Sequence, residues 1–311
     1  MKKRIFIAGQ DGMVGSAILK LIKEKKKFHI LNCRRKDLDL TIQTNVDYWF
    51  KKNKPQIVIN AAGRVGGILD NSSYLSDYIY INTLIGMNII NSSFKYNVQK
   101  LINLGSACIY PRKVKQPIKE EYLLNSYLEK TNEGYALAKI TSLKYCEYLR
   151  KQFKKDFISL QPTNLYGVND NFDLKSSHVL PALIKKFYIA KNKNKSSVEV
   201  WGTGNVEREF LNVEDLASAI YFCIINKIPY PYINVGSGDF ISIKNLASMI
   251  KKISKYKGRI LFNKNYPDGV LKRRLDSTKI NKLGWKRSIT LYKGVSNYYN
   301  YFKSTYHSNG K

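Results

Sequence analysis

The sequence predicts an α/β protein built around a doubly wound parallel sheet, with a smaller unit at the carboxyl end. Through the first half, short apolar segments alternate with longer helical patterns, an order typical of right-handed βαβ units. A glycine-rich turn follows the first apolar segment, and the alternation loosens after about residue 166. We therefore expect a Rossmann-type domain over residues 1–165 and a second domain over residues 166–311, with some later segments crossing back into the first.

Five strands are expected in the first domain. Each is a nearly continuous apolar run, which indicates a strand buried on both faces of the sheet. In chain order the runs are RIFIAG (4–9), FHILNC (28–33), QIVINAAG (56–63), KLINLGS (100–106) and DFISLQPTNLYG (156–167). The next segment, residues 167–190, is expected to form a loop followed by a helix.

Composition narrows the possible functions. No apolar run of the 311-residue chain approaches the roughly 18 residues of a membrane span, and the first apolar stretch runs directly into the glycine motif, unlike a signal peptide. The four cysteines contain no C-x-x-C pair and the three histidines are scattered, so neither a disulfide framework nor a metal site is indicated. We expect no metal, no membrane partner and a reducing, cytoplasmic location.

The formal net charge of +30 could indicate a polyanionic partner. However, the lysines occur in scattered short runs such as KEKKK, KKNK and KNKNK, which is typical of solvated helix faces. Attraction of small phosphorylated anions is the other interpretation. Nucleic acid is not expected as a partner, because no recognition motif accompanies the charge.

The segment GQDGMVG places Gly9, Gly12 and Gly15 between a strand and an apolar helical run. Glycines at this spacing permit a tight turn and close approach of the backbone to a pyrophosphate, whose charge the helix amino terminus stabilises. After the second strand, where an NAD-preferring site would carry an acidic residue, the chain has Arg34 and Arg35. Guanidinium groups suit a 2′-phosphate, so the pattern predicts NADP(H) as the cofactor.

The segment YALAK places Tyr135 and Lys139 on one face of a helix. A nearby ammonium group favours the phenolate form, so we expect Lys139 to lower the tyrosine pKa and make proton transfer to a carbonyl oxygen feasible. Ser106, at a strand end, is placed to assist. Cys108, two residues further on, is either a packing residue or part of a second activity.

These residues resemble the extended short-chain dehydrogenase/reductases and, within them, the GDP-L-fucose synthase family, which acts on GDP-4-keto-6-deoxy-D-mannose. The resemblance spans nearly the whole chain. It implies that the first domain binds NADP, that the second binds a nucleotide sugar, and that the protein is a homodimer. The segments that carry it include GSACIYP (105–111), TNEGYALAK (131–139), QPTNLYG (161–167), SSHVLPALI (176–184) and WGTGNVEREFLNVEDLA (201–217).

The resemblance also implies roles for individual residues. Ser106, Tyr135 and Lys139 would serve reduction at carbon 4, whereas Cys108 and His178 would be the acid/base pair for epimerisation at carbons 3 and 5. Arg208 would pair with the diphosphate. The implied cofactor-binding residues are Gly9, Gly12, Met13, Val14, Gly15, Arg34, Arg35, Asn60, Ala61, Ala62, Tyr135, Lys139, Pro162, Asn164, Leu165 and His178. The implied substrate-binding residues are Ser106, Ala107, Cys108, Asn164, Val179, Lys186, Trp201, Arg208 and Lys272.

Three functions stay open at this point. The first is NADPH-dependent reduction with 3,5-epimerisation, giving GDP-L-fucose. The second is reduction at carbon 4 of a related GDP-4-keto-6-deoxy hexose or heptose without epimerisation, in surface-polysaccharide sugar biosynthesis; Lys186, Gly134 and Ala107, which replace the family's usual arginine, proline and serine, leave it open. The third is a non-catalytic dinucleotide sensor or basic binding protein on the same fold. Loss of the tyrosine and lysine pair would indicate that third class, and both residues are present.

Overall fold

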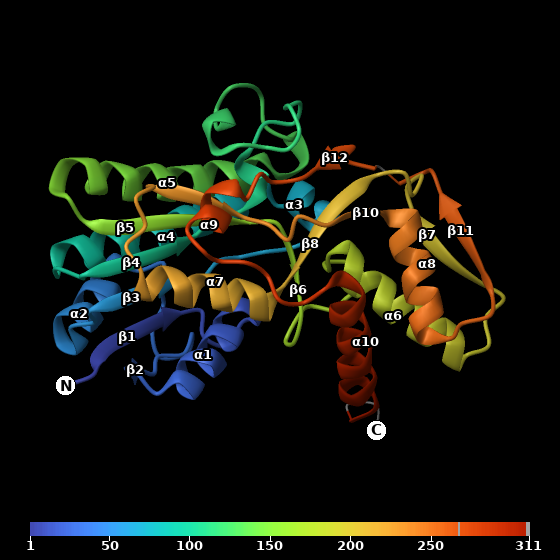
Figure 1. The fold of residues 1–311 in the computed structure, drawn as a ribbon, viewed down its shortest axis with the longest axis horizontal. Coiled ribbons are helices and arrows are strands. Elements are labelled where there is room, and N and C mark those ends of the chain that lie inside the picture. The colour runs from blue at the N-terminus through green and yellow to red at the C-terminus, as the bar shows by residue number, and fades with distance from the viewer. Residues whose placement is uncertain (267, 309–311) are drawn as a thin grey trace.

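The computed structural model describes residues 1–266 and 268–308. Its centre is a six-stranded sheet in which all the strand pairs are parallel. The order across the sheet is β2 (Phe28–Leu31), β1 (Lys3–Ala8), β3 (Ile57–Asn60), β4 (Lys100–Leu104), β5 (Asp156–Pro162) and β9 (Tyr232–Val235). This sheet and its helices occupy the left of Figure 1. The predicted fold class, a doubly wound parallel sheet, is confirmed.

Helices cover both faces of this sheet, which explains why its strands are apolar on both sides. On one face, α1 (Met13–Lys25) and α7 (Val213–Ile225) pack against strand residues such as Ile5 and Ile59. On the other, α2 (Gln43–Asn53), α4 (Leu75–Lys95) and α5 (Glu133–Phe153) pack against Phe6 and Val58. The side chains of β3, for example, are buried along its whole length.

The expected strand 156–167 is in fact two strands. β5 ends at Pro162, and β6 (Asn164–Tyr166) leaves the central sheet to pair with β8 (Glu207–Asn212). Proline has no amide hydrogen to continue a strand ladder, which explains the break. This crossing links the central sheet to the second unit of the protein.

The second unit lies on the right of Figure 1. There β8 pairs with β10 (Phe240–Ser242) and β12 (Lys272–Arg273), and β7 (Ser197–Trp201) pairs with β11 (Arg259–Asn263). Helices α6 (Val179–Asn192), α8 (Ile243–Ser254) and α10 (Leu291–Ser308) pack around a separate core that includes Phe187 and Phe302. The short helices are α3 (Ile68–Ser73) and α9 (Thr278–Lys282). β9 returns to the central sheet from this half of the chain, and the division at residue 165 stays a prediction.

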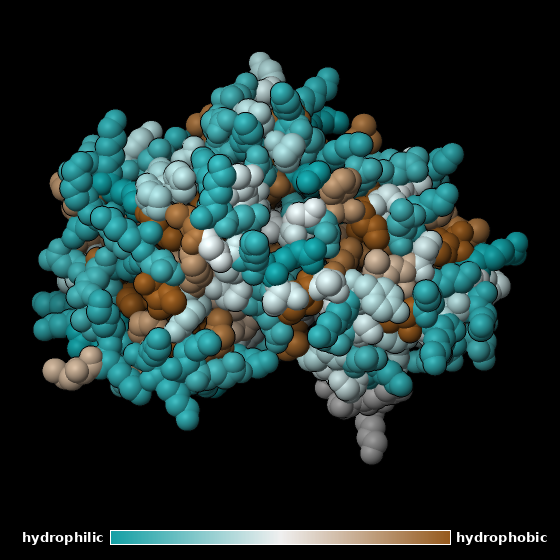
Figure 2. All heavy atoms as spheres, in the orientation of Figure 1, coloured by the Kyte–Doolittle hydropathy of each residue, from teal (hydrophilic) through white to brown (hydrophobic). Residues whose placement is uncertain are grey.

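Hydrophilic side chains cover most of the face shown in Figure 2, with smaller apolar areas between them. Among the helices of the described residues, none combines the length and apolar character needed to cross a membrane. The central sheet changes direction of winding between β1 and β3, since the chain goes from β1 outward to β2 and then returns to β3 on the other side. In open α/β sheets, ligands bind at the carboxyl ends of the strands at such a point.

Candidate active site

The glycine turn joins β1 to α1 at this carboxyl edge. Gly9 has φ +80°, a left-handed conformation that favours glycine, and a Cβ atom on Gly15 would lie 2.0 Å from Gly9 O. Gly12 differs, because a Cβ atom there would meet only Gly9 O, at an ordinary 3.5 Å. Gly12 is the N-cap of α1, and within the described residues no side chain caps this helix start. Its amide groups are therefore available to an anion.

The segment after β3 lies across the glycine turn, since a Cβ atom on Gly9 would be 2.9 Å from Ala61 O and from Ala62 N. Asn60 is buried and donates Nδ2 to Asn103 Oδ1 at 2.9 Å. Its own Oδ1 is buried without a hydrogen-bond partner among the described residues. The carboxyl ends of β1 and β3 thus bring together the predicted residues Gly9, Gly12, Met13, Val14, Gly15, Asn60, Ala61 and Ala62.

Arg34 and Arg35 follow β2, the strand next to β1, and both are exposed. The backbone amide of Arg34 donates to Asp37 Oδ2 at 3.0 Å, which shapes the turn. Within residues 1–266 and 268–308, neither guanidinium group forms an ion pair. Both charges are therefore available to an anionic ligand beside the glycine turn.

Tyr135 and Lys139 lie one turn apart on α5, as predicted, with Lys139 Nζ 5.7 Å from the centroid of the Tyr135 ring. The ammonium group donates to Leu104 O at 2.9 Å, and burial lowers the pKa of Lys139 to about 8. Ser106 forms a side-chain hydrogen bond with Tyr135. The predicted residues Ser106, Tyr135 and Lys139 therefore lie together at the end of β4.

The expectation that Lys139 lowers the pKa of Tyr135 is wrong. Burial raises the pKa of Tyr135 and the neighbouring Cys108 raises it further, whereas the hydrogen bond from Ser106 acts in the opposite direction. The reason is geometric, since the ammonium group of Lys139 is directed at Leu104 O. Tyr135 is consequently a protonated phenol at neutral pH.

Cys108 lies in a short 3-10 turn, η1 (Ala107–Ile109), and its amide donates to Ser106 Oγ at 3.1 Å. It is partly exposed, whereas the other three cysteines are buried. Burial raises the pKa of Cys33 to about 11 and that of Cys146 and Cys223 to about 12. Cys108 is thus the most accessible of the four cysteines, and it lies next to Ser106, the hydrogen-bond partner of Tyr135.

Two arginines face Cys108. In β8, Arg208 donates Nη1 to Val270 O at 2.6 Å, and in β12, Arg273 donates Nη1 to Ala107 O at 2.5 Å. Burial lowers the pKa of both guanidinium groups, that of Arg208 to about 10, and for both the charge of Cys108 has the opposite effect. The surroundings of Cys108 are therefore strongly cationic.

His178 is the N-cap of α6, directly before Val179, as the predicted loop and helix require. Part of the residue is open to solvent, yet the protein packed around it lowers its pKa by desolvation. The preceding loop is tied to the start of α3, because Gly67 N donates to Ser176 O at 2.7 Å. Within the part of the chain described, no hydrogen bond joins His178 to Cys108 or Tyr135.

The remaining predicted substrate residues form two groups. In the first, Lys186 Nζ lies 4.6 Å from the centroid of the Trp201 ring and donates to Glu199 O. In the second, which surrounds β8, Asn164 Nδ2 donates to Glu209 O and Lys272 Nζ pairs with Glu207 at 3.3 Å. Two predicted cofactor residues lie nearby, Pro162 at the end of β5 and Leu165 in β6, the strand that pairs with β8.

Four residues at or near the site were not predicted from the sequence. Gln161 Oε1 accepts from Ser106 N at 3.0 Å, Glu209 is a buried carboxylate, and the Tyr266 ring stacks on Trp201 with centroids 4.2 Å apart. Gln161 and Glu209 lie inside the motifs quoted above, which could have drawn attention to them. Arg273 lies in a KRR run that resembles the other basic runs of the chain, so no sequence signal distinguished it.

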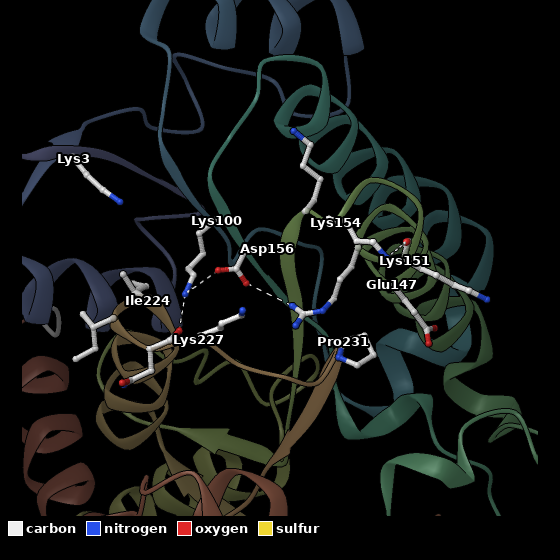
Figure 3. Close-up of a pocket in the computed structure, with 13 residues that line it drawn as sticks. Lys3, Lys100, Glu147, Lys151, Lys154, Asp156, Ile224, Lys227 and Pro231 are labelled. Atoms are coloured by element: carbon white, nitrogen blue, oxygen red, sulfur yellow. Dashed lines mark hydrogen bonds and ion pairs between the residues drawn. The ribbon is translucent and has the colours of Figure 1, made fainter.

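A hollow of about 820 Å³ lies away from this site, at the opposite edge of the sheet, where β1, β4 and β5 begin (Figure 3). In it, Asp156 lies between Lys100 and Arg150 at 3.2 and 3.5 Å, and Lys100 also donates to Cys223 O in the last turn of α7. Cations at a helix carboxyl terminus are stabilising. We interpret these charges as structural; the other cations of the hollow are Lys3, Lys151, Lys154, Lys155 and Lys227.

Comparison with known proteins places this site in a family. Residues 5–236 match the NAD dependent epimerase/dehydratase family. The GDP-L-fucose synthase of Sinorhizobium fredii is 44% identical over 302 residues, covering 97% of this chain and 96% of that protein.

Two solved structures are also similar over nearly the whole chain. A GDP-mannoheptose C4 reductase from Campylobacter jejuni with NADP bound has a TM-score of 0.89 at 35% identity, covering 97% of this chain and 98% of its own. A GDP-L-fucose synthetase from Naegleria fowleri bound to NADP has a TM-score of 0.89 at 26% identity, covering 100% and 97%. The glycine turn, the tyrosine and lysine pair and these full-length similarities lead to one conclusion: the chain belongs to the NAD dependent epimerase/dehydratase family and, within it, to the GDP-L-fucose synthases.

Proposed function

We propose that this protein reduces carbon 4 of a GDP-4-keto-6-deoxy sugar with NADPH and epimerises carbons 3 and 5, giving GDP-L-fucose. The observation that carries the proposal is the convergence of Ser106, Cys108 and Tyr135 at the end of β4, beside Arg208. A simple reductase needs the serine and the tyrosine but not the thiol. The GDP-L-fucose synthase relative at 44% identity supports the same activity.

The residues at the glycine turn fit NADPH, which supplies a hydride. The space over Gly12 and the uncapped start of α1 suit the pyrophosphate, and Arg34 and Arg35 suit a 2′-phosphate. The buried Oδ1 of Asn60 accepts no hydrogen bond from the described residues, and a polar ligand group could supply one. NADP is also bound in two similar solved structures.

For reduction, we assign the proton donor to Tyr135. Its raised pKa keeps the phenol protonated at neutral pH, so it can donate to the carbonyl oxygen at carbon 4 as negative charge develops there. Ser106 orients the phenol through their hydrogen bond. Lys139, fixed by Leu104 O, holds the helix turn that carries Tyr135, and we assign its positive charge to the cofactor beside the tyrosine ring.

For epimerisation, we assign the proton exchange to Cys108 and His178. The ketone at carbon 4 acidifies the C–H bonds at carbons 3 and 5, so one group can remove a proton while another returns a proton to the opposite face. A thiol and an imidazole both have ordinary pKa values close enough to neutrality for this work. The position of His178 at the start of α6, on a different element from Cys108, supports approach from another direction.

Different parts of the substrate are assigned to the two groups of residues, one at β7 and one around β8. Arg208 is assigned to the diphosphate, because its buried guanidinium group can form charge-assisted hydrogen bonds there. Lys186 and Trp201 are assigned to the nucleotide part of the substrate; in the free protein the indole ring contacts Lys186 and stacks with Tyr266. The other proposed contacts are Ala107, Asn164, Val179 and Lys272.

We also propose a homodimer formed by α4 and α5, which pack along each other (Figure 1). On α4, Tyr80 is 67% exposed, and on α5, Leu137 and Tyr148 are 39% and 52% exposed. Apolar side chains on two adjacent helices match what a second copy could cover in a four-helix arrangement. Replacing Leu137 with Glu should convert the dimer to a monomer in light scattering, and an unchanged mass would reject this interface. The cytoplasmic location likewise stays a prediction.

Product analysis separates the proposal from its alternative, the carbon-4 reduction of a related GDP-4-keto hexose or heptose. That alternative is supported by the similar GDP-mannoheptose C4 reductase structure. The protein should be incubated with NADPH and each GDP-4-keto sugar, and the products identified by NMR. The fucose configuration from GDP-4-keto-6-deoxy-D-mannose supports the proposal, whereas an unepimerised alcohol or turnover of the heptose alone contradicts it.

A further inference from the structure

Arg273 is a basic residue outside the set assigned above. It lies in β12, where it is paired with Arg208 of β8 in a parallel register. Its guanidinium group is set deeply enough for burial to lower its pKa. Burying a positive charge costs free energy unless the charge has hydrogen-bond or ionic partners. The partners of Arg273 therefore indicate what it does.

The contacts of Arg273 enclose the turn that holds Cys108. Nη1 donates to Ala107 O at 2.5 Å and lies 3.5 Å from Tyr110 O. These two carbonyl groups lie on either side of Cys108 in the chain, and Ala107 begins η1. Arg273 is 166 residues from Ala107 in sequence, so the second unit of the protein fixes the turn that presents the thiol.

The charges around Cys108 come from three elements. Arg208 of β8 and Arg273 of β12 are cations that interact with it, and Tyr135 of α5 also interacts with it. Glu129 interacts with both arginines, but its carboxylate lies 3.2 Å from Arg112 Nε and is thereby partly neutralised. Asp268 also interacts with Arg208, whereas Glu129 is the carboxylate that interacts with Arg273.

We propose that Arg273 is a positioning residue that holds the Cys108 turn and stabilises the thiolate required for epimerisation, an inference that rests on the function proposed above. In that step the thiolate takes a proton from the carbon beside the ketone. The S–H bond forms, the C–H bond breaks, and its electron pair moves to the ketone oxygen as an enolate. His178 then returns a proton to the carbon from the other face, and exchange with water resets both groups.

Alkylation of the Cys108 thiol tests the effect of the Arg273 charge and needs no substrate. Cys108 is partly exposed and the other cysteines are buried, so the rate at which iodoacetamide labels the Cys108 peptide, followed by mass spectrometry across pH, reports its thiolate fraction. Arg273→Gln keeps a hydrogen-bond donor and removes the charge. It should raise the midpoint of the alkylation profile by about one pH unit and slow labelling at pH 7 by about tenfold.

Three controls make the result specific. Arg273→Lys keeps the charge and should recover most of the rate. Arg274→Gln removes a neighbouring cation that stacks on Phe240 at 4.7 Å, away from Cys108, and should label like wild type. Circular dichroism should confirm that each variant is folded, and if Arg273→Gln does not fold, Arg273→Lys and Arg273→Met are compared instead.

Wild-type labelling across pH in folded Arg273→Gln would overturn the inference, because a purely structural clamp would leave the thiolate fraction unchanged. A shifted profile supports it. Deuterium uptake at carbons 3 and 5 of the substrate separates this result from the fate of the proposed function. If the profile shifts but wild type takes up no deuterium, epimerisation fails as the function while the charge effect of Arg273 holds. If wild type takes up deuterium and the profile does not shift, only the inference about Arg273 fails.

Discussion

Lys139 Nζ lies 2.9 Å from the carbonyl oxygen of Leu104, the last residue of β4. This hydrogen bond ties the catalytic face of α5 to the carboxyl end of the sheet, two residues before Ser106. Burial lowers the pKa of this ammonium group to about 8, so its charge is present below that pH and lost above it. The contact thus anchors the helix turn that carries Tyr135, and the loss of the lysine charge above that pH leads to the first prediction.

The first prediction is an alkaline limit set by Lys139. We expect kcat/KM for NADPH, which reports the pKa values of the free enzyme, to fall as pH rises through about 8. Lys139→Met should lower activity throughout and remove that limb from the profile. A profile that stays flat to pH 10 in wild type would contradict the assignment.

The second prediction concerns Tyr135 as the proton donor. Tyr135→Phe should lower turnover by roughly a hundredfold or more and leave NADPH binding, followed by fluorescence, nearly intact. Tyr127→Phe is the matched control, because Tyr127 is 90% exposed and outside the proposed site. Near-normal turnover in Tyr135→Phe would show that another group supplies the proton.

The third prediction separates two glycines of the same turn. A Cβ atom on Gly12 would make only an ordinary van der Waals contact with Gly9 O, whereas one on Gly15 would overlap that atom. Gly12→Ala should therefore keep the melting temperature of the free protein but weaken NADPH binding about tenfold or more, a loss of about 1.4 kcal/mol. Gly15→Ala should destabilise the fold by about 1–3 kcal/mol. Unchanged NADPH affinity in Gly12→Ala would mean that the cofactor does not approach this residue closely.

The fourth prediction is a preference for NADPH over NADH of at least about tenfold in kcat/KM, equivalent to about 1.4 kcal/mol. Replacing Arg34 and Arg35 together with Ala should remove it, at roughly 1.5–3 kcal/mol for each charged hydrogen bond lost to the 2′-phosphate. Replacing Lys151 and Lys154 together with Ala, at the opposite edge of the sheet, controls for the loss of two positive charges. Equal efficiency with both cofactors in wild type would reject the assignment.

The sequence was sufficient to predict the central sheet, because strands such as β3 and β4 are covered on both faces and are therefore apolar throughout. It was also sufficient to predict that Tyr135 and Lys139 share a helix face. The direction in which Lys139 points was not predictable, since it depends on the carbonyl of Leu104. The pKa of Tyr135 was predicted in the wrong direction for a related reason, because burial outweighs the effect expected from the lysine.

The environment of Cys108 is a second feature that the sequence alone did not predict. Motif spacing identified the cysteine, but its neighbours Arg208 and Arg273 come from strands far along the chain that become adjacent only when β8 and β12 pair. The family resemblance pointed to Arg208, but nothing in the composition distinguishes Arg273 among the 53 lysines and arginines. Long-range pairing decides which charges meet, and a single sequence does not encode that visibly.

The central claim, that Cys108 exchanges protons with the substrate, is tested most directly by deuterium uptake. GDP-4-keto-6-deoxy-D-mannose is incubated with the protein in heavy water without NADPH, and carbons 3 and 5 are followed by NMR. We predict uptake at both carbons in wild type, strong suppression in Cys108→Ser and impaired uptake in His178→Asn, with Cys108→Ser still forming an unepimerised 4-reduced sugar once NADPH is added. Absence of uptake in wild type, together with an unepimerised alcohol as product, would contradict the account and leave a simple carbon-4 ketoreductase.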